Sequence, residues 1–195
     1  MQRRIFASFL LTFVVAALLP AAGRVEGVST APLRIEVFSD FQCPACKALH
    51  EGVLESLTTD YVKTGKAYLI HREYPLPMHR YSREAAMYAV AAGRLSKYDA
   101  VADALFAQQA SWSVSGKVEA VVASALSPAE MKKVKAMAQE GSVAAEVDRD
   151  IAEGRRSGVT RTPSMYVTSH GRQYPVPPGT SYPILKRFFD ELLSR

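Results

Sequence analysis

The chain has 195 residues, a formal net charge of +5 and 48% hydrophobic residues. Its basic residues are too few and too scattered to indicate a nucleic-acid-binding protein, and the densest cluster, Lys132, Lys133 and Lys135, is explained by one solvated helix face. With no internal repeat and no low-complexity tract, the sequence predicts one domain with a sizeable core.

The first residues have the pattern of a secretory signal. Arg3 and Arg4 precede the apolar stretch Ile5–Leu19, and small residues follow at 21–23. That stretch is shorter than the ~20 residues of a membrane-spanning helix, although an uncleaved N-terminal anchor stays an alternative. We predict that residues 1–23 are a signal peptide and that the protein is exported to a periplasm or cell envelope, where disulfides persist.

The next part of the chain predicts strand, helix and strand. Leu33–Phe38 is apolar without clean alternation, as expected of a strand buried on both faces. Pro44 suits the first turn of a helix that continues at helical spacing until Gly65. Ala67–Glu73 predicts a second strand.

Residues 75–158 predict a block of helices. Ser82–Leu95 is rich in alanine and apolar nearly all round, which predicts a buried helix. A helix is expected over Tyr98–Gln109, ending before residues 111–113, and a short apolar helix over Val118–Leu126.

Two further helices complete this block. A capping box at residues 127–130 begins one of them, with proline at its first helical position. Val143, Val147 and Ile151 mark one face of the other, which is expected to end near Gly158.

The last part of the chain predicts a hairpin and a helix. Ser164–Thr168 and Gln173–Val176 have strand patterns, and Ser181 can cap a final amphipathic helix. The order of elements predicts an α/β layer over residues 24–195 with a helical insertion at about 75–158.

Cys43 and Cys46 are the only cysteines and lie three residues apart, between the first strand and the first helix. A structural bridge over so short a loop would add only roughly 2 kcal/mol by chain entropy, which favours reversible disulfide chemistry. Cys43 lies just before the helix, where first-turn N–H groups favour the thiolate and lower the pKa. We therefore expect Cys43 to be the exposed nucleophile and Cys46 to be buried and to resolve mixed disulfides.

Two motifs together resemble the DsbA-like thiol–disulfide oxidoreductases: FSDFQCPAC at residues 38–46 and GVTRTPS at residues 158–164. The similarity extends over essentially all of residues 24–195. It implies a thioredoxin-like fold with an inserted all-helical domain. It also implies a dithiol oxidase that passes the Cys43–Cys46 disulfide to secreted proteins through a mixed disulfide on Cys43, with no cofactor besides that disulfide.

The resemblance assigns roles to four neighbours of the cysteines. Pro44 and Ala45 tune the pair. Ala45 stands where a histidine is frequent in the DsbA subgroup, and alanine supplies neither a hydrogen bond nor a charge. A less extreme oxidant than DsbA is therefore expected. The Thr162–Pro163 bond is expected to be cis, with the Thr162 backbone free to pair with an extended substrate segment and its hydroxyl able to influence the thiolate. The alternative is an ordinary proline at the start of the following strand.

The proton acceptor is where this chain departs from its relatives. Val37 occupies a position that in many relatives holds a buried acid. Glu36 and Asp40 are the nearby candidates to accept the proton of Cys46. Alternatively, Glu36 ends at a strand edge and Asp40 only caps the active-site loop.

The resemblance implies two kinds of partner for an enzyme expected to be a monomer. Substrates would be unfolded or newly exported cysteine-containing proteins. A membrane redox partner, either a quinone-linked oxidase or an electron donor, would set the direction, so a reductase stays open. An isomerase is less favoured, because no dimerisation module is visible in the sequence.

Two other classes of function stay open. A copper or zinc carrier would use Cys43, Cys46 and His50, although a closed zinc site needs a fourth ligand, and the other histidines lie far away in sequence. We therefore expect no metal. A chaperone that holds peptides near Pro163 without turnover is the third reading.

Overall fold

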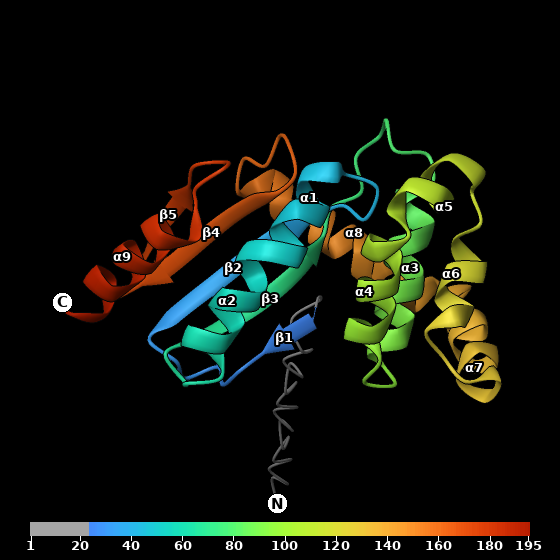
Figure 1. Cartoon of the computed structure of the whole chain (residues 1–195), viewed down its shortest axis with the longest axis horizontal. Coiled ribbons are helices and arrows are strands. Elements are labelled where there is room, and N and C mark those ends of the chain that lie inside the picture. Colours follow the sequence, from blue (N-terminus) through green and yellow to red (C-terminus); the bar gives the residue numbers. More distant parts are fainter. Residues whose placement is uncertain (1–23) are drawn as a thin grey trace, which may run out of the picture.

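The computed structural model describes residues 24–195, and the predicted signal peptide at residues 1–23 lies outside this range. Five strands form one sheet in the order β1-β3-β2-β4-β5. Their bounds are β1 Arg24–Glu26, β2 Leu33–Ser39, β3 Ala67–Glu73, β4 Ser164–Ser169 and β5 Arg172–Val176. The central strand β2 pairs parallel with β3 and antiparallel with β4. Figure 1 shows the sheet beside a separate block of helices.

The four strands expected from the sequence are confirmed, but β1 was not predicted. It has only three residues, too few for a recognisable pattern, and Val25 is 44% exposed. It forms because β3 offers a free edge, with which β1 pairs antiparallel. Glu26 also lies 2.9 Å from His71 of β3.

The helix predicted from Pro44 is a continuous helical run with changes of pitch. It comprises α1 Pro44–Ala48, the π-helical η1 Leu49–Leu54, α2 Glu55–Leu57 and the π-helical η2 Thr58–Val62. Gly65, with a φ of +73°, follows its end. The run covers the face of the sheet that carries Leu33, Ile35 and Val37, and α9 Tyr182–Leu193 packs into the same core.

The helical block contains five of the six helices between β3 and β4, and α8 links it to the sheet (Figure 1). Their bounds are α3 Ser82–Gly93, α4 Tyr98–Ala107, α5 Gln109–Ser115, α6 Val118–Ser124, α7 Pro128–Ala138 and α8 Gly141–Arg156. Among residues 24–195 no helix is long and apolar enough to cross a membrane.

The helix predicted over Tyr98–Gln109 does end before residues 111–113, since α4 stops at Ala107, but residues 111–113 form a separate helix, α5, that was not predicted. Trp112 is fully buried and its indole N–H donates to the Leu105 carbonyl at 2.6 Å. This tertiary contact outweighs the weak helix propensity of the flanking serines. Ser181 does precede α9, but its side chain makes no cap bond.

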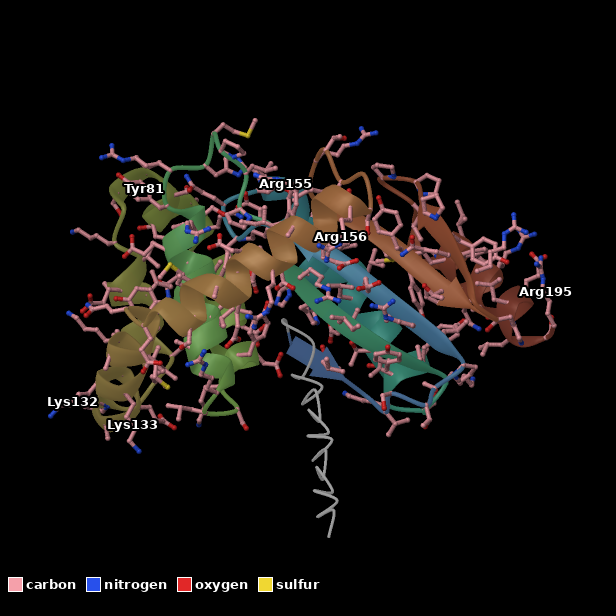
Figure 2. The ribbon with its side chains drawn as sticks, turned by 180° about the vertical axis from the view of Figure 1, so that it is seen from behind. Tyr81, Lys132, Lys133, Arg155, Arg156 and Arg195 are labelled. Carbon is pink, nitrogen blue, oxygen red and sulfur yellow. The ribbon has the colours of Figure 1, made fainter. Side chains whose placement is uncertain are left out.

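The capping box at the start of α7 is confirmed. The Ser127 hydroxyl accepts from the Glu130 N–H, and the Glu130 side chain accepts from the Ser127 N–H. The lysines of this helix are exposed, and Figure 2 shows Lys132 and Lys133 at the end of the helical block opposite Tyr81.

Helix α8 crosses the face of the sheet opposite α1; in Figure 2, the view from behind, it lies in front of the strands, with Arg155 and Arg156 near its end. Arg72 of β3 joins the two layers, because it donates to Asp150 of α8 at 3.0 Å and to Glu36 of β2 at 2.8 Å. Farther along α8, a Cβ at Gly154 would lie 2.4 Å from the Tyr74 ring. Glycine therefore permits the close approach of α8 to the sheet.

Candidate active site

Cys43 is the N-cap residue of α1, with extended backbone angles, and Pro44 follows in the first turn. The Cys43 carbonyl accepts from the Cys46 N–H at 3.1 Å and from the Lys47 N–H at 3.2 Å, which begins the helix. The sequence-based placement of the pair at a helix start is therefore confirmed. Both thiols are free in this structure.

The expectation of an exposed nucleophile was wrong. Cys43 is only 8% exposed, although it is more accessible than Cys46 at 1%. The Cys43 sulfur donates to the Thr162 carbonyl at 3.4 Å. On the other side, the Gln109 amide donates to the carbonyls of Phe41 and Cys43, at 2.7 and 3.0 Å, and brings α5 against the loop. The resemblance placed Thr162 near the thiolate, whereas the sequence gives no sign of the Gln109 contacts.

The two thiols have opposite acidities. A hydrogen bond from Cys46, assisted by Thr162 and by the N–H groups of Cys46 and Ala45, lowers the pKa of Cys43 to about 5 against the effect of burial. The hydrogen bond to Cys43 and burial raise the pKa of Cys46. The helix N–H groups thus contribute as predicted, but the larger effect comes from the partner sulfur.

The Thr162–Pro163 peptide bond is cis, as the resemblance implied. The Thr162 hydroxyl is buried and has no hydrogen-bond partner among the described residues. It is therefore available to the Cys43 thiolate, whose pKa Thr162 lowers. Pro163 lines a small, mainly apolar hollow of about 40 Å³ together with Leu49, Met165 and Leu185.

Glu36 was a candidate proton acceptor, and its surroundings do not suit that role. It lies in the central strand, not at an edge, and accepts from Arg72 and Arg34 at 2.8 and 2.7 Å. Its partner Arg72 also donates to Asp150 of α8, which places Glu36 on the face covered by α8, whereas Cys46 belongs to α1 on the opposite face. The alternation of side chains along β2 thus separates Glu36 from the thiols.

Asp40, the second candidate, lies in contact with the pair but has no free acceptor position. Its side chain is fully buried, and its two oxygens accept four hydrogen bonds from neighbouring donors. A carboxylate offers about four acceptor positions. Asp40 therefore holds the active-site loop in place more completely than a simple cap would.

Glu73 is a buried acid that sequence reasoning missed. It lies at the end of β3, in register with Ser39 of β2, and is 2% exposed. Burial raises its pKa to about 8, with the charges of Asp150 and Asp40 adding to the shift and the Tyr98 hydroxyl, 2.5 Å away, opposing it. Within residues 24–195 no cation pairs with Glu73.

Ser39 is the register partner of Glu73 and a neighbour of Cys46. Register partners on parallel strands point to the same face, so Glu73 and Ser39 both face the layer of α1. The Ser39 hydroxyl in turn contacts Cys46 and lowers its pKa, opposing the hydrogen bond to Cys43 and the burial that raise it. A charged residue at the end of an otherwise buried strand was the signal available in the sequence.

The arrangement that a metal carrier would need is missing from the described part of the chain. No three of its histidine, cysteine, aspartate and glutamate side chains form a cluster able to hold a metal ion. His50 instead lies 2.8 Å from Asp103 of α4 and packs on the Phe106 ring. The grouping of Cys43, Cys46 and His50 that the alternative metal carrier would use is therefore not observed.

Comparison with known sequences decides the family. The sequence model of a family described as Thioredoxin matches residues 21–181. The chain belongs to this thioredoxin family. A Bacillus cereus protein named "Probable disulfide bond formation protein D" is 23% identical over 153 residues, which cover 74% of this chain and 69% of that protein.

Solved structures show the same fold. Wolbachia pipientis alpha-DsbA1 has a TM-score of 0.72 at 19% identity, over 90% of this chain and 92% of that chain. Oxidised BdbD from Bacillus subtilis has a TM-score of 0.72 at 20% identity, over 89% of this chain and 94% of that chain. The predicted fold, thioredoxin-like with a helical insertion, is confirmed.

These comparisons also confirm the resemblance to DsbA-like proteins. Family membership together with the pair Cys43 and Cys46 makes the protein a thiol–disulfide oxidoreductase.

Proposed function

We propose that the protein is an exported dithiol oxidase that donates the Cys43–Cys46 disulfide to client proteins. The opposite shifts of the two thiol pKa values are the observation that carries this proposal. A thiolate stabilised at Cys43 favours the reduced enzyme, and a disulfide whose reduced form is stabilised is an oxidant.

The proposed reaction has two exchange steps. A client thiolate attacks the Cys43 sulfur, the Cys43–Cys46 bond breaks, and Cys46 leaves with the electron pair. A second client thiolate then attacks the client sulfur of the mixed disulfide, and Cys43 leaves as a stabilised thiolate. The client has lost two electrons to the enzyme, and Cys46 has taken up a proton.

The proton for Cys46 is assigned here to Glu73. A carboxyl with a pKa of about 8 is largely protonated at neutral pH and can give a proton to the departing Cys46 thiolate. Glu36 lies on the opposite face of the sheet, paired with arginines, and the Asp40 oxygens already accept four hydrogen bonds, so neither presents an oxygen to the departing thiolate. Apart from the disulfide, this chemistry needs no cofactor.

Clients would be unfolded or newly exported proteins, bound through the backbone of Thr162 beside Pro163. A membrane redox partner would restore the disulfide. The "disulfide bond formation" in the name of the Bacillus cereus relative supports the oxidase direction over a reductase. The signal-like residues 1–23 support export.

A redox titration of the mature chain in glutathione buffers tests the direction. We expect a potential between about −120 mV, a strong oxidant, and about −270 mV, a thioredoxin-like reductant. A potential less oxidising than about −120 mV is expected because Ala45 offers no side-chain donor or charge beside Cys43. A potential at or below the thioredoxin value would contradict an oxidase.

Trapping in cells tests the clients. In Cys46→Ala, mixed disulfides on Cys43 should accumulate with exported proteins and with one membrane partner, and Cys43→Ala is the matched control. Adducts only with an electron donor of the membrane would identify a reductase instead.

A further inference from the structure

Asp40 links both cysteines to the segment that leads into the helical block. Its carbonyl accepts from the Cys43 N–H at 3.0 Å, and its own N–H points at the Cys46 sulfur at 3.4 Å. The hydrogen bond to Cys43 and burial raise the pKa of Cys46, and the Asp40 N–H is the largest influence in the opposite direction. The backbone of this one residue therefore contacts both members of the redox pair.

The Asp40 carboxylate fixes that backbone through donors from three segments. Oδ1 accepts from the Gln42 N–H at 2.7 Å and from the Ser82 hydroxyl at 2.5 Å. Oδ2 accepts from the Leu76 N–H at 2.7 Å and lies 2.8 Å from His79 Nδ1. The donors come from the active-site loop, from residues 76–79 after β3, and from the start of α3.

Two neighbouring contacts strengthen the same junction. The Gln42 side chain accepts from the Tyr81 N–H at 2.9 Å and donates to the Ser113 carbonyl at 3.2 Å. The loop before Cys43 is thus held from the helical block on both sides. Figure 1 shows that the segment between β3 and α3 lies at the same end of the molecule as the start of α1.

Cys46 carries negative charge during exchange in either direction. When a thiolate attacks Cys43, the new S–S bond joins the attacker to Cys43, and the electron pair of the broken bond goes to Cys46. In the reverse direction, the Cys46 thiolate attacks Cys43. A donor held at the Cys46 sulfur stabilises this charge, and exchange is faster when the leaving thiolate is more stable.

We propose that Asp40 is a positioning residue for Cys46: its buried carboxylate, held by Ser82 and by residues 76–79, keeps its N–H aimed at the sulfur that leaves or attacks. These contacts from the helical insertion thereby raise the rate of exchange. This inference rests on exchange at Cys43 as proposed above, but not on its direction.

The test uses the oxidised full-length mature chain and reduced glutathione as the attacking thiol. Asp40→Asn keeps the size of the side chain but places an N–H₂ group against the donors of Oδ2, so glutathione should attack about tenfold more slowly. Ser82→Ala removes one of four contacts and should slow the attack about threefold. Asp60→Asn is the matched control, because Asp60 accepts from the Tyr182 hydroxyl at 2.5 Å away from the thiols, and its rate should not change.

A second measurement separates positioning from a general loosening of the loop. In a Cys46→Ala background the N–H of Asp40 has no sulfur to donate to. There, Asp40→Asn should change the rate of iodoacetamide alkylation of Cys43 by no more than about twofold. An equal slowing in both assays would overturn the proposal, and so would an unchanged glutathione rate. If Asp40→Asn does not fold, an unchanged rate in Ser82→Ala overturns it.

The outcome is independent of the proposed oxidase direction. Slow glutathione attack in Asp40→Asn together with no client oxidation by the wild type would support the role of Asp40 and contradict the oxidase function. Normal client oxidation by Asp40→Asn, together with unchanged glutathione kinetics in that variant, would support the oxidase function and contradict the role of Asp40.

Discussion

The Cys43 sulfur lies 3.4 Å from the carbonyl oxygen of Thr162, although the two residues are 119 positions apart in the chain. This contact brings the start of α1 against the loop before β4, and it places the unpaired Thr162 hydroxyl beside the nucleophile. Thr162→Val should therefore remove a donor to the thiolate and raise the pKa of Cys43 by roughly one pH unit. The absorbance of the thiolate at 240 nm, followed against pH, measures it.

Thr160→Val is the control for this substitution. Thr160 is exposed two residues earlier in the same loop, so the pKa of Cys43 should not move. An equal rise in both variants would attribute the effect to loop conformation and not to the hydroxyl.

Cys46→Ala should raise the pKa of Cys43 more than Thr162→Val does. The hydrogen bond from Cys46 is the largest cause of the low Cys43 pKa, and alanine cannot donate. Cys46→Ser retains a donor and should restore part of the acidity. If serine and alanine variants had the same Cys43 pKa, the assigned hydrogen bond would be wrong.

Glu73→Gln should change the pH dependence of stability. The pKa of Glu73 is 4.5 in a model peptide and about 8 in the folded chain, so the folded state favours the protonated carboxyl. Its contribution to the free energy of unfolding is fully present below pH 4.5 and is lost as the pH rises toward 8. Chemical denaturation of the reduced wild type should show this loss, and Glu73→Gln should show less of it.

Asp150 also titrates in this window, because burial raises its pKa to about 6. The difference between wild type and Glu73→Gln isolates the contribution of Glu73. Parallel stability curves for the two proteins would show that Glu73 is ionised in the fold at neutral pH, and would remove it as the proton source for Cys46.

Gly154→Ala should lower the free energy of unfolding by about 1–3 kcal/mol. Its Cβ would lie 2.4 Å from the Tyr74 ring and 3.1 Å from the Phe38 ring, so α8 must move away from the sheet. Gly52→Ala is the matched control, since its Cβ would have no neighbour within 4 Å. There, alanine should leave stability unchanged or raise it slightly, as urea denaturation would measure.

The elements that the sequence predicted well are those with local signals. Period and composition identified β2, β3 and the hairpin, and a capping box identified the start of α7. The short strand β1 and the helical state of residues 111–113 depend on tertiary partners, an open sheet edge and the burial of Trp112, which no local pattern carries.

The candidate site divides in the same way. The cysteine spacing and the motif around Pro163 identified the active site, because each is a short contiguous sequence motif. The burial of Cys43, the four hydrogen bonds to Asp40 and the raised pKa of Glu73 arise from contacts between distant segments. Glu36 was proposed as a proton acceptor because the sequence does not show which helix covers each face of β2. The structure places its side chain on the face opposite the thiols, where it pairs with Arg72.

The site lowers the pKa of Cys43 and raises that of Cys46, so that the thiolate forms at Cys43 while Cys46 stays protonated. Alkylation of the reduced protein by iodoacetamide, followed against pH with the modified cysteine located by mass spectrometry, tests it directly. The site predicts modification of Cys43 with a midpoint near pH 5. A midpoint near the ordinary thiol value of 9, or earlier modification of Cys46, would contradict it.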